Sequence, residues 1–445
     1  MLNLKEKKHL YPVTTSVSKE GYLYIGGCST VELRNKFGTP LYIIDEETLT
    51  RNIKKYLSAF KENYTNFLLL YAAKAFANSA IFQLVNKLDL GLDVVSGGEL
   101  HLALKSGFNK EKIYFHGNNK QISEIELAIE ANIGKIVCDN LYELELIQLL
   151  SKKYNKTTNI LIRLTPGIEC HTHEYIKTGH LNSKFGLDLE YFKEVLNYIQ
   201  TKGKNIALCG IHSHIGSQIF EIKPYLDTIE ILLNEFHYAK KNFKIELNEL
   251  NIGGGIGIAY TKEDDPFSIE EFVQKVTSKI KTTCKSLGLK LPLLVCEPGR
   301  SLISNAGITI YTVGSIKTIP GGIKYITIDG GMADNPRPIT YQAKYTACIG
   351  NKMNATKSEK ITIAGRYCES GDILIKNITL PKIETGDLLV VLNTGAYNYS
   401  MSSNYNMVPR PACVLVKDGN AEIIIERETY DDVIRKHKML KRLTN

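Results

Sequence analysis

The stretch FLLLYAAKAFAN, residues 67–78, opens the part of the chain that decides the fold. It starts with an apolar run, and such runs recur as far as Glu297, with amphipathic stretches between most of them. The runs are FLLLY (67–71), GLDVV (91–95), IYF (113–115), KIVC (135–138), NILIRL (159–164), IALCGIHSH (206–214), ELNI (249–252) and LLVCE (293–297). Continuous apolar runs are typical of parallel strands buried on both faces. The pattern predicts a (β/α)₈ TIM-type barrel, and a doubly wound open sheet is the competing topology.

The sequence pattern changes after about residue 305. The later runs ITIYTVGSIKTI, YITIDGG, KITIAG and DLLVVLNTGAY are β-rich and are separated by Gly, Pro and Asp turns. They predict a second, mostly antiparallel domain, and GYLYIGG (21–27) is expected to add a strand to it. We therefore expect a barrel over residues 47–305, inserted into a discontinuous β domain made of 1–46 and 306–445.

The overall composition is that of a soluble enzyme, with 445 residues, 43% of them apolar and 23% charged. The formal net charge is +8, and the basic residues are scattered. This distribution favours an ordinary solvated surface, although a mild positive field would also attract an acidic substrate. Because no nucleic-acid-binding motif accompanies the charge, no nucleic-acid partner is expected.

The cysteines and the N-terminus bear on the compartment. The nine cysteines contain no C-x-x-C pair, which argues against a disulfide scaffold or a structural zinc site and favours a reducing cytoplasm. The start, MLNLKEKKHL, lacks the apolar core of a signal peptide. The most apolar stretch, 67–85, carries Lys74 and Asn78, so no membrane span is expected.

Functional residues of a TIM-type barrel lie where its strands end. Lys74 stands just beyond the first run, within the apolar segment YAAKAFAN. A lone lysine commonly extends its amine to the surface. Alternatively, a dry site lowers the pKa of the amine and makes it a nucleophile for a Schiff base. Both interpretations stay open at this point.

The sixth run ends in GIHSHIGSQ, which contains His212, His214 and Ser217. These are interpreted as turn residues, as a metal pair, or as an imidazole lying against a flat aromatic cofactor. No third ligand follows at a suitable spacing, so no metal site is expected.

The seventh and eighth runs end in NIGGGIGIAY (251–260) and CEPGRS (296–301). Backbone N–H groups of the glycine-rich loop could hold a phosphate. Glu297 could keep a pyridine nitrogen protonated, and Arg300 could pair with a phosphate or carboxylate. The alternative for the last pair is a surface ion pair in a Pro-Gly turn. Taken together, an amine, a phosphate loop and a carboxylate predict a pyridoxal-phosphate site.

From about Thr39 to Val416 the chain resembles the fold type III pyridoxal-phosphate-dependent decarboxylases, whose barrel is of the alanine-racemase type. The matching segments are YAAKAFAN, DVVSGGEL, GIHSHIGSQ, NIGGGIG, EPGRS, CESGD and GAYNYSMSSNYN. Within this family it is most similar to the branch that acts on diaminopimelate, through THEYIKTGHLNSKFG (172–186), NPRPITYQAKY and CESGDIL. Where the family usually has Gly-Pro, this chain reads GRYCES, with Arg366 in place of proline, which puts the shape of that loop in doubt.

The resemblance implies a role for each matching residue. Lys74 would bind the cofactor as a Schiff base and Cys368 would be the proton donor. The cofactor-binding set it implies is Lys74, His214 (stacked on the ring), Ser217, Gly254, Gly255, Glu297 (at the pyridine nitrogen), Gly299, Arg300 and Tyr397. The substrate-binding set it implies is Arg300, Arg337, Tyr341, Glu369 and Tyr397.

The resemblance further implies decarboxylation of meso-2,6-diaminopimelate to L-lysine, the last step of lysine biosynthesis. The expected partner is a second copy of the chain, since Cys368 and Glu369 would reach into the neighbour's barrel mouth. The alternatives are a decarboxylase for ornithine, lysine or a carboxylated polyamine, and a non-catalytic pyridoxal-phosphate carrier. The segment 172–186 argues against the former, and the second domain with its CESGD argues against the latter. A racemase would need a catalytic tyrosine in the second domain, for which no convincing match is found.

Overall fold

The computed structural model describes residues 8–168 and 183–443. The chain forms two compact units, which are treated separately below. The barrel unit comprises Arg51–Ile258 and Asp265–Leu302, and the β unit comprises Met1–Thr50, Ala259–Asp264 and Ile303–Asn445. The segment Ala259–Asp264 thus leaves the barrel sequence and belongs to the β unit.

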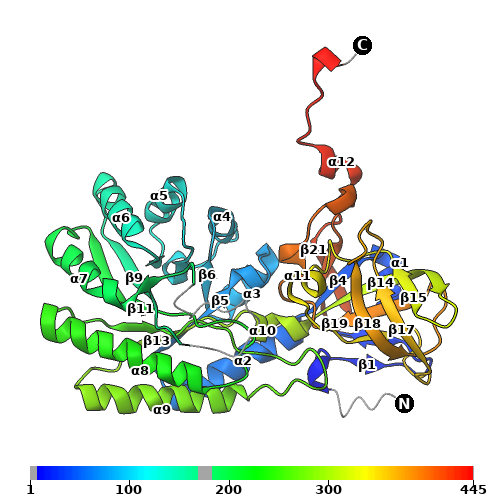
Figure 1. The fold of residues 1–445 in the computed structure, drawn as a ribbon, viewed down its shortest axis with the longest axis horizontal. Coiled ribbons are helices and arrows are strands. Elements are labelled where there is room, and N and C mark those ends of the chain that lie inside the picture. The colour runs from blue at the N-terminus through cyan, green and yellow to red at the C-terminus, as the bar shows by residue number, and fades with distance from the viewer. Residues whose placement is uncertain (1–7, 169–182, 444–445) are drawn as a thin grey trace. The chain divides into compact units, whose positions relative to one another are not determined.

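The barrel unit contains a closed parallel barrel (Figure 1). Its strands are β5 (Phe67–Ala72), β6 (Gly91–Val94), β7 (Ile113–Phe115), β8 (Lys135–Cys138), β9 (Thr158–Thr165), β11 (Ile206–His212), β12 (Glu249–Asn251) and β13 (Leu293–Cys296). Each corresponds to one of the apolar runs. Pairing of β8 with β9 and of β13 with β5 closes the ring, and β10 (Leu187–Asp188) extends it beside β9. The predicted barrel is confirmed, and the open sheet is wrong.

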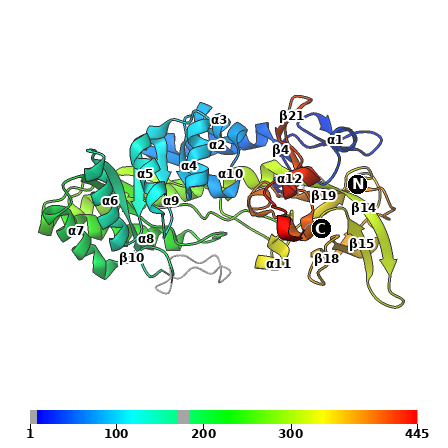
Figure 2. The same ribbon diagram turned by 90° about the horizontal axis from the view of Figure 1, so that it is seen from above.

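Helices surround the strands, as the two views in Figures 1 and 2 show. They are α2 (Glu46–Asn63), α3 (Ser79–Lys87), α4 (Gly97–Lys105), α5 (Ile122–Ala131), α6 (Leu141–Lys153), α7 (Phe192–Thr201), α8 (Lys223–Tyr238), α9 (Ile269–Leu287) and α10 (Arg300–Ile303). Polar residues fix several helix starts. Side chains of Asn78, Ser96 and Asn140 accept backbone N–H groups at the first turns of α3, α4 and α6. The loop between each of these strands and its helix is therefore short and well defined.

The interior of the barrel is filled by side chains from several of its strands. A buried layer consists of Leu70, Tyr114, Val137, Leu161 and Val295. Because this layer is packed solid, the chemistry must take place above it, where the strands end.

The β unit has one large sheet and one small one. The large sheet contains β4 (Leu41–Asp45), β14 (Gly307–Thr318), β15 (Lys324–Ile328), β16 (Ala347–Ile349), β17 (Glu359–Ala364), β18 (Ile373–Leu380), β19 (Leu388–Leu392), β20 (Ala412–Lys417) and β21 (Asn420–Ile425). Its pairings are antiparallel except β15 with β17 and β20 with β4. This confirms the predicted, mostly antiparallel second domain.

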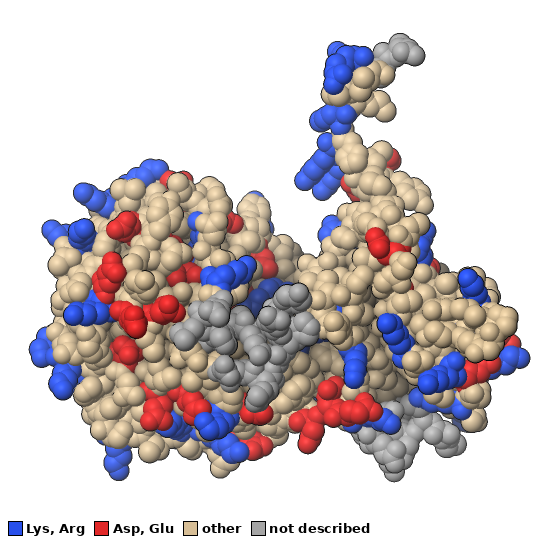
Figure 3. All heavy atoms as spheres, viewed as in Figure 1, with Lys and Arg blue, Asp and Glu red and all other residues tan. Residues whose placement is uncertain are grey.

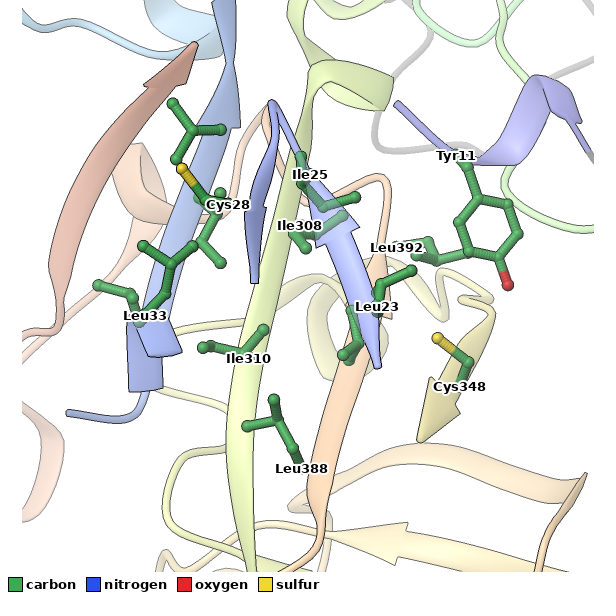
Figure 4. Close-up of a cluster of buried hydrophobic side chains, with 14 of the residues drawn as sticks. Tyr11, Leu23, Ile25, Cys28, Leu33, Ile308, Ile310, Cys348, Leu388 and Leu392 are labelled. Atoms are coloured by element: carbon green, nitrogen blue, oxygen red, sulfur yellow. The ribbon is translucent and has the colours of Figure 1, made fainter. Parts of the chain in front are cut away.

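The N-terminal strand of the large sheet is β4, and the stretch 21–27 lies elsewhere. That stretch supplies β2 (Leu23–Ile25), which joins β1 (Ser16–Val17) and β3 (Cys28–Ser29) in the small sheet. Apolar side chains connect the two sheets in a buried cluster drawn in Figure 4, where Leu23 and Ile25 pack with residues of β14 and β19 such as Ile308 and Leu388. The expected strand exists, but it packs on the large sheet instead of extending it.

Three helices complete the β unit, α1 (Thr30–Phe37), α11 (Arg337–Tyr341) and α12 (Tyr430–Ile434). Among the described residues, no helix is both long and apolar enough to cross a membrane. On the face drawn in Figure 3, basic and acidic side chains are intermixed. Basic residues do gather along the C-terminal segment after α12.

Candidate active site

The predicted amine lies at the carboxyl end of the first barrel strand. Lys74 is in a single 3₁₀ turn, Ala73–Ala75, directly after β5. Its Nζ lies 3.4 Å from Oδ2 of Asp93, a fully buried residue of β6. Gly299 approaches the end of β5 and this turn so closely that an added Cβ would lie 2.9 Å from the Cβ of Ala72 and 3.2 Å from the Cβ of Ala75. The lysine thus has a tightly packed base and a buried counter-charge.

Glu297, directly after β13, is the centre of a buried polar cluster. Its Oε1 accepts a hydrogen bond from Asn251 Nδ2 at 2.7 Å and lies 2.9 Å from His116 Nε2. Its Oε2 lies 3.3 Å from His212 Nε2. The two imidazole rings pack edge to face with centroids 4.8 Å apart. Three strand ends therefore direct nitrogen atoms at one carboxylate.

This arrangement sets the charge states of Glu297 and His212. Burial by itself raises the pKa of Glu297, but His116 and His212 outweigh burial and hold that pKa well below its usual value. Burial lowers the pKa of His212 to about 3 against the opposing effect of Glu297, so this imidazole is neutral at physiological pH. The carboxylate is therefore an anion, as required of a group that faces a protonated ring nitrogen.

His214 and the glycine loop form the next part of the site. Burial, followed by the positive charges of Lys74 and Arg163, holds the pKa of His214 well below its usual value. The neutral ring accepts a hydrogen bond at Nδ1 from the N–H of Gly254 at 3.2 Å. Arg300 donates to Ser217 Oγ at 3.0 Å on the same side. Two of the predicted phosphate-binding groups are thus in direct contact.

The loop 253–255 admits only glycine. A Cβ at Gly254 would lie 2.0 Å from the carbonyl oxygen of Glu297, and one at Gly255 would lie 2.0 Å from that of Gly216. Gly253 has a φ of +67°. The backbone here is a cradle without side chains, and such a cradle suits a phosphate group.

Gly254→Ala is expected to weaken pyridoxal-phosphate binding by about tenfold to a hundredfold, because the methyl group must displace the backbone of the cradle. Equilibrium dialysis with the cofactor measures the effect. Gly98→Ala is the matched control, since Gly98 is exposed on α4 and the nearest atom to its new Cβ would lie 3.7 Å away. Equal affinities of the two variants would contradict the cradle.

His116, His212 and Glu297 also place possible ligand atoms within 4.8 Å of one another, which a metal ion could use. The arrangement also fits pyridoxal phosphate, since an amine, an anionic carboxylate and a phosphate cradle surround one strand-end region. Lys74, His214, Ser217, Gly254, Gly255, Glu297 and Arg300 are the residues that could hold it.

Arg337, Tyr341 and Tyr397 lie in the β unit. Arg337 begins α11, is buried, and donates to the hydroxyl of Tyr345 at 2.7 Å. Its guanidinium lies over the ring of Tyr260, 4.8 Å from the centroid. Tyr341 ends α11, and Tyr397 has a φ of +60°, which is a strained backbone for a bulky residue. The arginine is thus held in one orientation.

Cys368 and Glu369 lie in an exposed loop of the β unit. Tyr405 donates to Glu369 Oε1 at 2.7 Å, and the N–H of Cys368 donates to Asn406 at 3.2 Å. The N–H of Arg366 donates to the carbonyl of Gly330 at 3.0 Å, a bond that proline could not make. The loop is therefore anchored at this position without the usual proline.

Asp93, His116 and Asn251 were not singled out from the sequence. Each lies in or directly after a predicted strand, so the rule that barrel strands end in functional residues could have found them. The segment 172–182, part of the stretch that distinguishes the diaminopimelate branch, lies outside the described residues.

A closed barrel with this set of strand-end groups defines a pyridoxal-phosphate-dependent enzyme of fold type III. In agreement, the family described as "Pyridoxal-dependent decarboxylase, pyridoxal binding domain" matches residues 50–304. Diaminopimelate decarboxylases from Synechocystis sp. and Bacillus subtilis are 47% and 43% identical to the chain, over 98% and 95% of its length and 94% and 96% of theirs.

Solved structures agree with the sequence relatives. A crystal structure of diaminopimelate decarboxylase from M. jannaschii has a TM-score of 0.91 at 36% identity, covering 97% of this chain and 99% of that one. One from Helicobacter pylori, complexed with L-lysine, has a TM-score of 0.83 at 30% identity, covering 91% and 98%. The chain belongs to the diaminopimelate decarboxylase family of the pyridoxal-dependent decarboxylases. The predicted enzyme class and cofactor are thereby confirmed.

Proposed function

We propose that this chain catalyses the decarboxylation of meso-2,6-diaminopimelate to L-lysine and CO₂, the last step of lysine biosynthesis. The near full-length identity to diaminopimelate decarboxylases carries the proposal. L-lysine in a related structure supports it, because lysine is the product expected of this reaction. When bound, pyridoxal phosphate supplies the electron sink for the charge left by the departing CO₂.

In this proposal the barrel residues hold the cofactor. Lys74 binds it covalently, Ser217, Gly254, Gly255 and Arg300 hold its phosphate, His214 lies against its ring, and Glu297 faces its ring nitrogen. Gly299 keeps the lysine turn in close contact with the last strand, as its short distance to Ala72 requires. Asp93 gives the amine a buried negative neighbour.

The β unit supplies most of the proposed substrate contacts. The amino-acid centre of diaminopimelate that does not react keeps a carboxylate, and L-lysine keeps it too. A guanidinium can bind a carboxylate with two hydrogen bonds, and Arg337 is already oriented by Tyr345 and Tyr260. Tyr341, Tyr397 and Arg300 add contacts, and Glu369 binds the distal ammonium. Ornithine has no second carboxylate, so such a buried arginine would serve no purpose for it.

Arg337→Lys is expected to raise the KM for diaminopimelate by about tenfold to a hundredfold, since an ammonium cannot reproduce the paired hydrogen bonds. Inhibition by L-lysine should weaken by a similar factor. CO₂ release from meso-diaminopimelate, ornithine, lysine and arginine is the assay. Arg34→Lys, on α1 of the same unit, is the control. If the native enzyme turns over ornithine faster than diaminopimelate, the proposed substrate is wrong.

We also propose that the enzyme is a homodimer with shared active sites. Cys368 and Glu369 are exposed in the single chain, although a proton donor needs a site from which water is excluded. A second copy with two-fold symmetry would bring this loop to its barrel mouth and receive the same in return. A cytoplasmic location is proposed as well, supported by the eight free cysteines among the described residues.

A further inference from the structure

His116 occupies a position between two buried carboxylates. Its Nε2 lies 2.9 Å from Oε1 of Glu297 and 3.7 Å from Oδ1 of Asp93. The side chains of Asp93 and Glu297 are 0% and 3% exposed, so neither charge is screened by water. The other oxygen of Asp93 lies 3.4 Å from the amine of Lys74. One imidazole therefore links the group that would face the ring nitrogen with the group beside the catalytic lysine.

The other neighbours of Glu297 cannot replace His116 between the two carboxylates. His212 is neutral, because burial lowers its pKa to about 3, and it can offer only one N–H. Asn251 is an uncharged amide donor. Arg163 of β9 adds a positive field at both Glu297 and Asp93, but burial opposes its charge and lowers its pKa. His116, directly after β7, is the neighbour whose Nε2 lies near both carboxylates.

The number of hydrogen-bond donors to Glu297 decides whether a proton shared with the pyridine nitrogen stays on the nitrogen or moves to the carboxylate. Each N–H that points at a carboxylate stabilises its anion and lowers its affinity for a proton. A proton between Glu297 and a pyridine nitrogen then stays on the nitrogen, the form that accepts electrons. If a donor is lost, the carboxylate becomes more basic and competes for this proton.

We propose that His116 is a positioning residue that keeps Glu297 ionised and thereby keeps the cofactor ring protonated, with Asp93 as a second carboxylate near the same imidazole nitrogen. The inference rests on the proposed function only in that the site binds pyridoxal phosphate. It does not depend on which amino acid is decarboxylated.

The test uses the holoenzyme loaded with pyridoxal phosphate carrying ¹⁵N at the ring nitrogen, whose chemical shift reports protonation without any substrate. The variants are His116→Ala, which removes the imidazole nitrogen 2.9 Å from Glu297, and His116→Gln, which keeps an N–H group. His101→Gln is the matched control, because His101 is exposed on α4. Activity on diaminopimelate is measured separately, so a wrong substrate and a wrong role for His116 give different results.

In the native enzyme and in His101→Gln, the nitrogen is expected to be protonated across neutral pH. In His116→Ala the signal should move toward the unprotonated position and kcat should fall about tenfold to a hundredfold, the effect of one hydrogen bond to a charged group. His116→Gln should restore most of the ring signal. If both His116 variants keep the native ¹⁵N signal and pH profile, the proposal is overturned. If His116→Ala fails to fold, the test rests on His116→Gln. The N–H that this variant keeps predicts a near-native ¹⁵N signal, so a displaced signal would also overturn the proposal.

Discussion

Lys74→Ala is expected to lower kcat by about 10⁴-fold or more, on the scale seen when an enzyme loses its nucleophile. The amine follows β5, with Oδ2 of Asp93 3.4 Å away. The purified native enzyme should be yellow. Reduction with borohydride should fix the cofactor to the peptide that contains Lys74.

The control for this experiment is Lys105→Ala, which removes an exposed lysine at the end of α4. It should keep native activity and native labelling. Dialysis shows whether Lys74→Ala still binds pyridoxal phosphate without the covalent bond, which separates lost chemistry from lost folding. Labelling of a different lysine would reject the assignment of Lys74.

The second large effect is recovery of activity on mixing two inactive variants. Lys74→Ala lacks the amine in the barrel, and Cys368→Ala lacks the proposed proton donor in the exposed loop of the β unit. If sites are shared, a heterodimer has one intact site, built from Lys74 of one chain and Cys368 of the other. Random exchange of equal amounts makes half of the dimers mixed, so activity should return to about a quarter of the native value.

The matched control mixes Lys74→Ala with Glu297→Ala. Both changes lie in the barrel unit, so every site of the mixed dimer carries one defect and no recovery is expected. Native mass spectrometry of differently labelled chains verifies the exchange. If Lys74→Ala and Cys368→Ala exchange subunits and stay inactive, each site is built within one chain. Cys368→Ala by itself should also release misprotonated or transaminated products.

The sequence by itself determined the barrel and predicted much of the cofactor site. Strand and helix formation depends on local hydrophobic patterning, so the runs from FLLLY (67–71) to LLVCE (293–297) predicted every barrel strand. The rule that barrel function lies at strand ends then pointed to Lys74, to the glycines 253–255 and to Glu297. A loop that only glycine can form and a lysine in an apolar segment are both visible without coordinates.

The tertiary structure decided the side-chain contacts that form when the barrel closes. His116 follows β7 and Glu297 follows β13, and nothing local in the chain indicates that their side chains lie 2.9 Å apart. The same holds for Asn251 at the other side of the carboxylate, and for Tyr260, which leaves the barrel sequence to pack under Arg337 in the β unit. Strand pairing brings distant segments together, and a hydrophobic pattern carries no record of which partner each polar side chain will meet. The sequence therefore predicted the groups of the site, whereas folding determined the partners that set their charge and orientation.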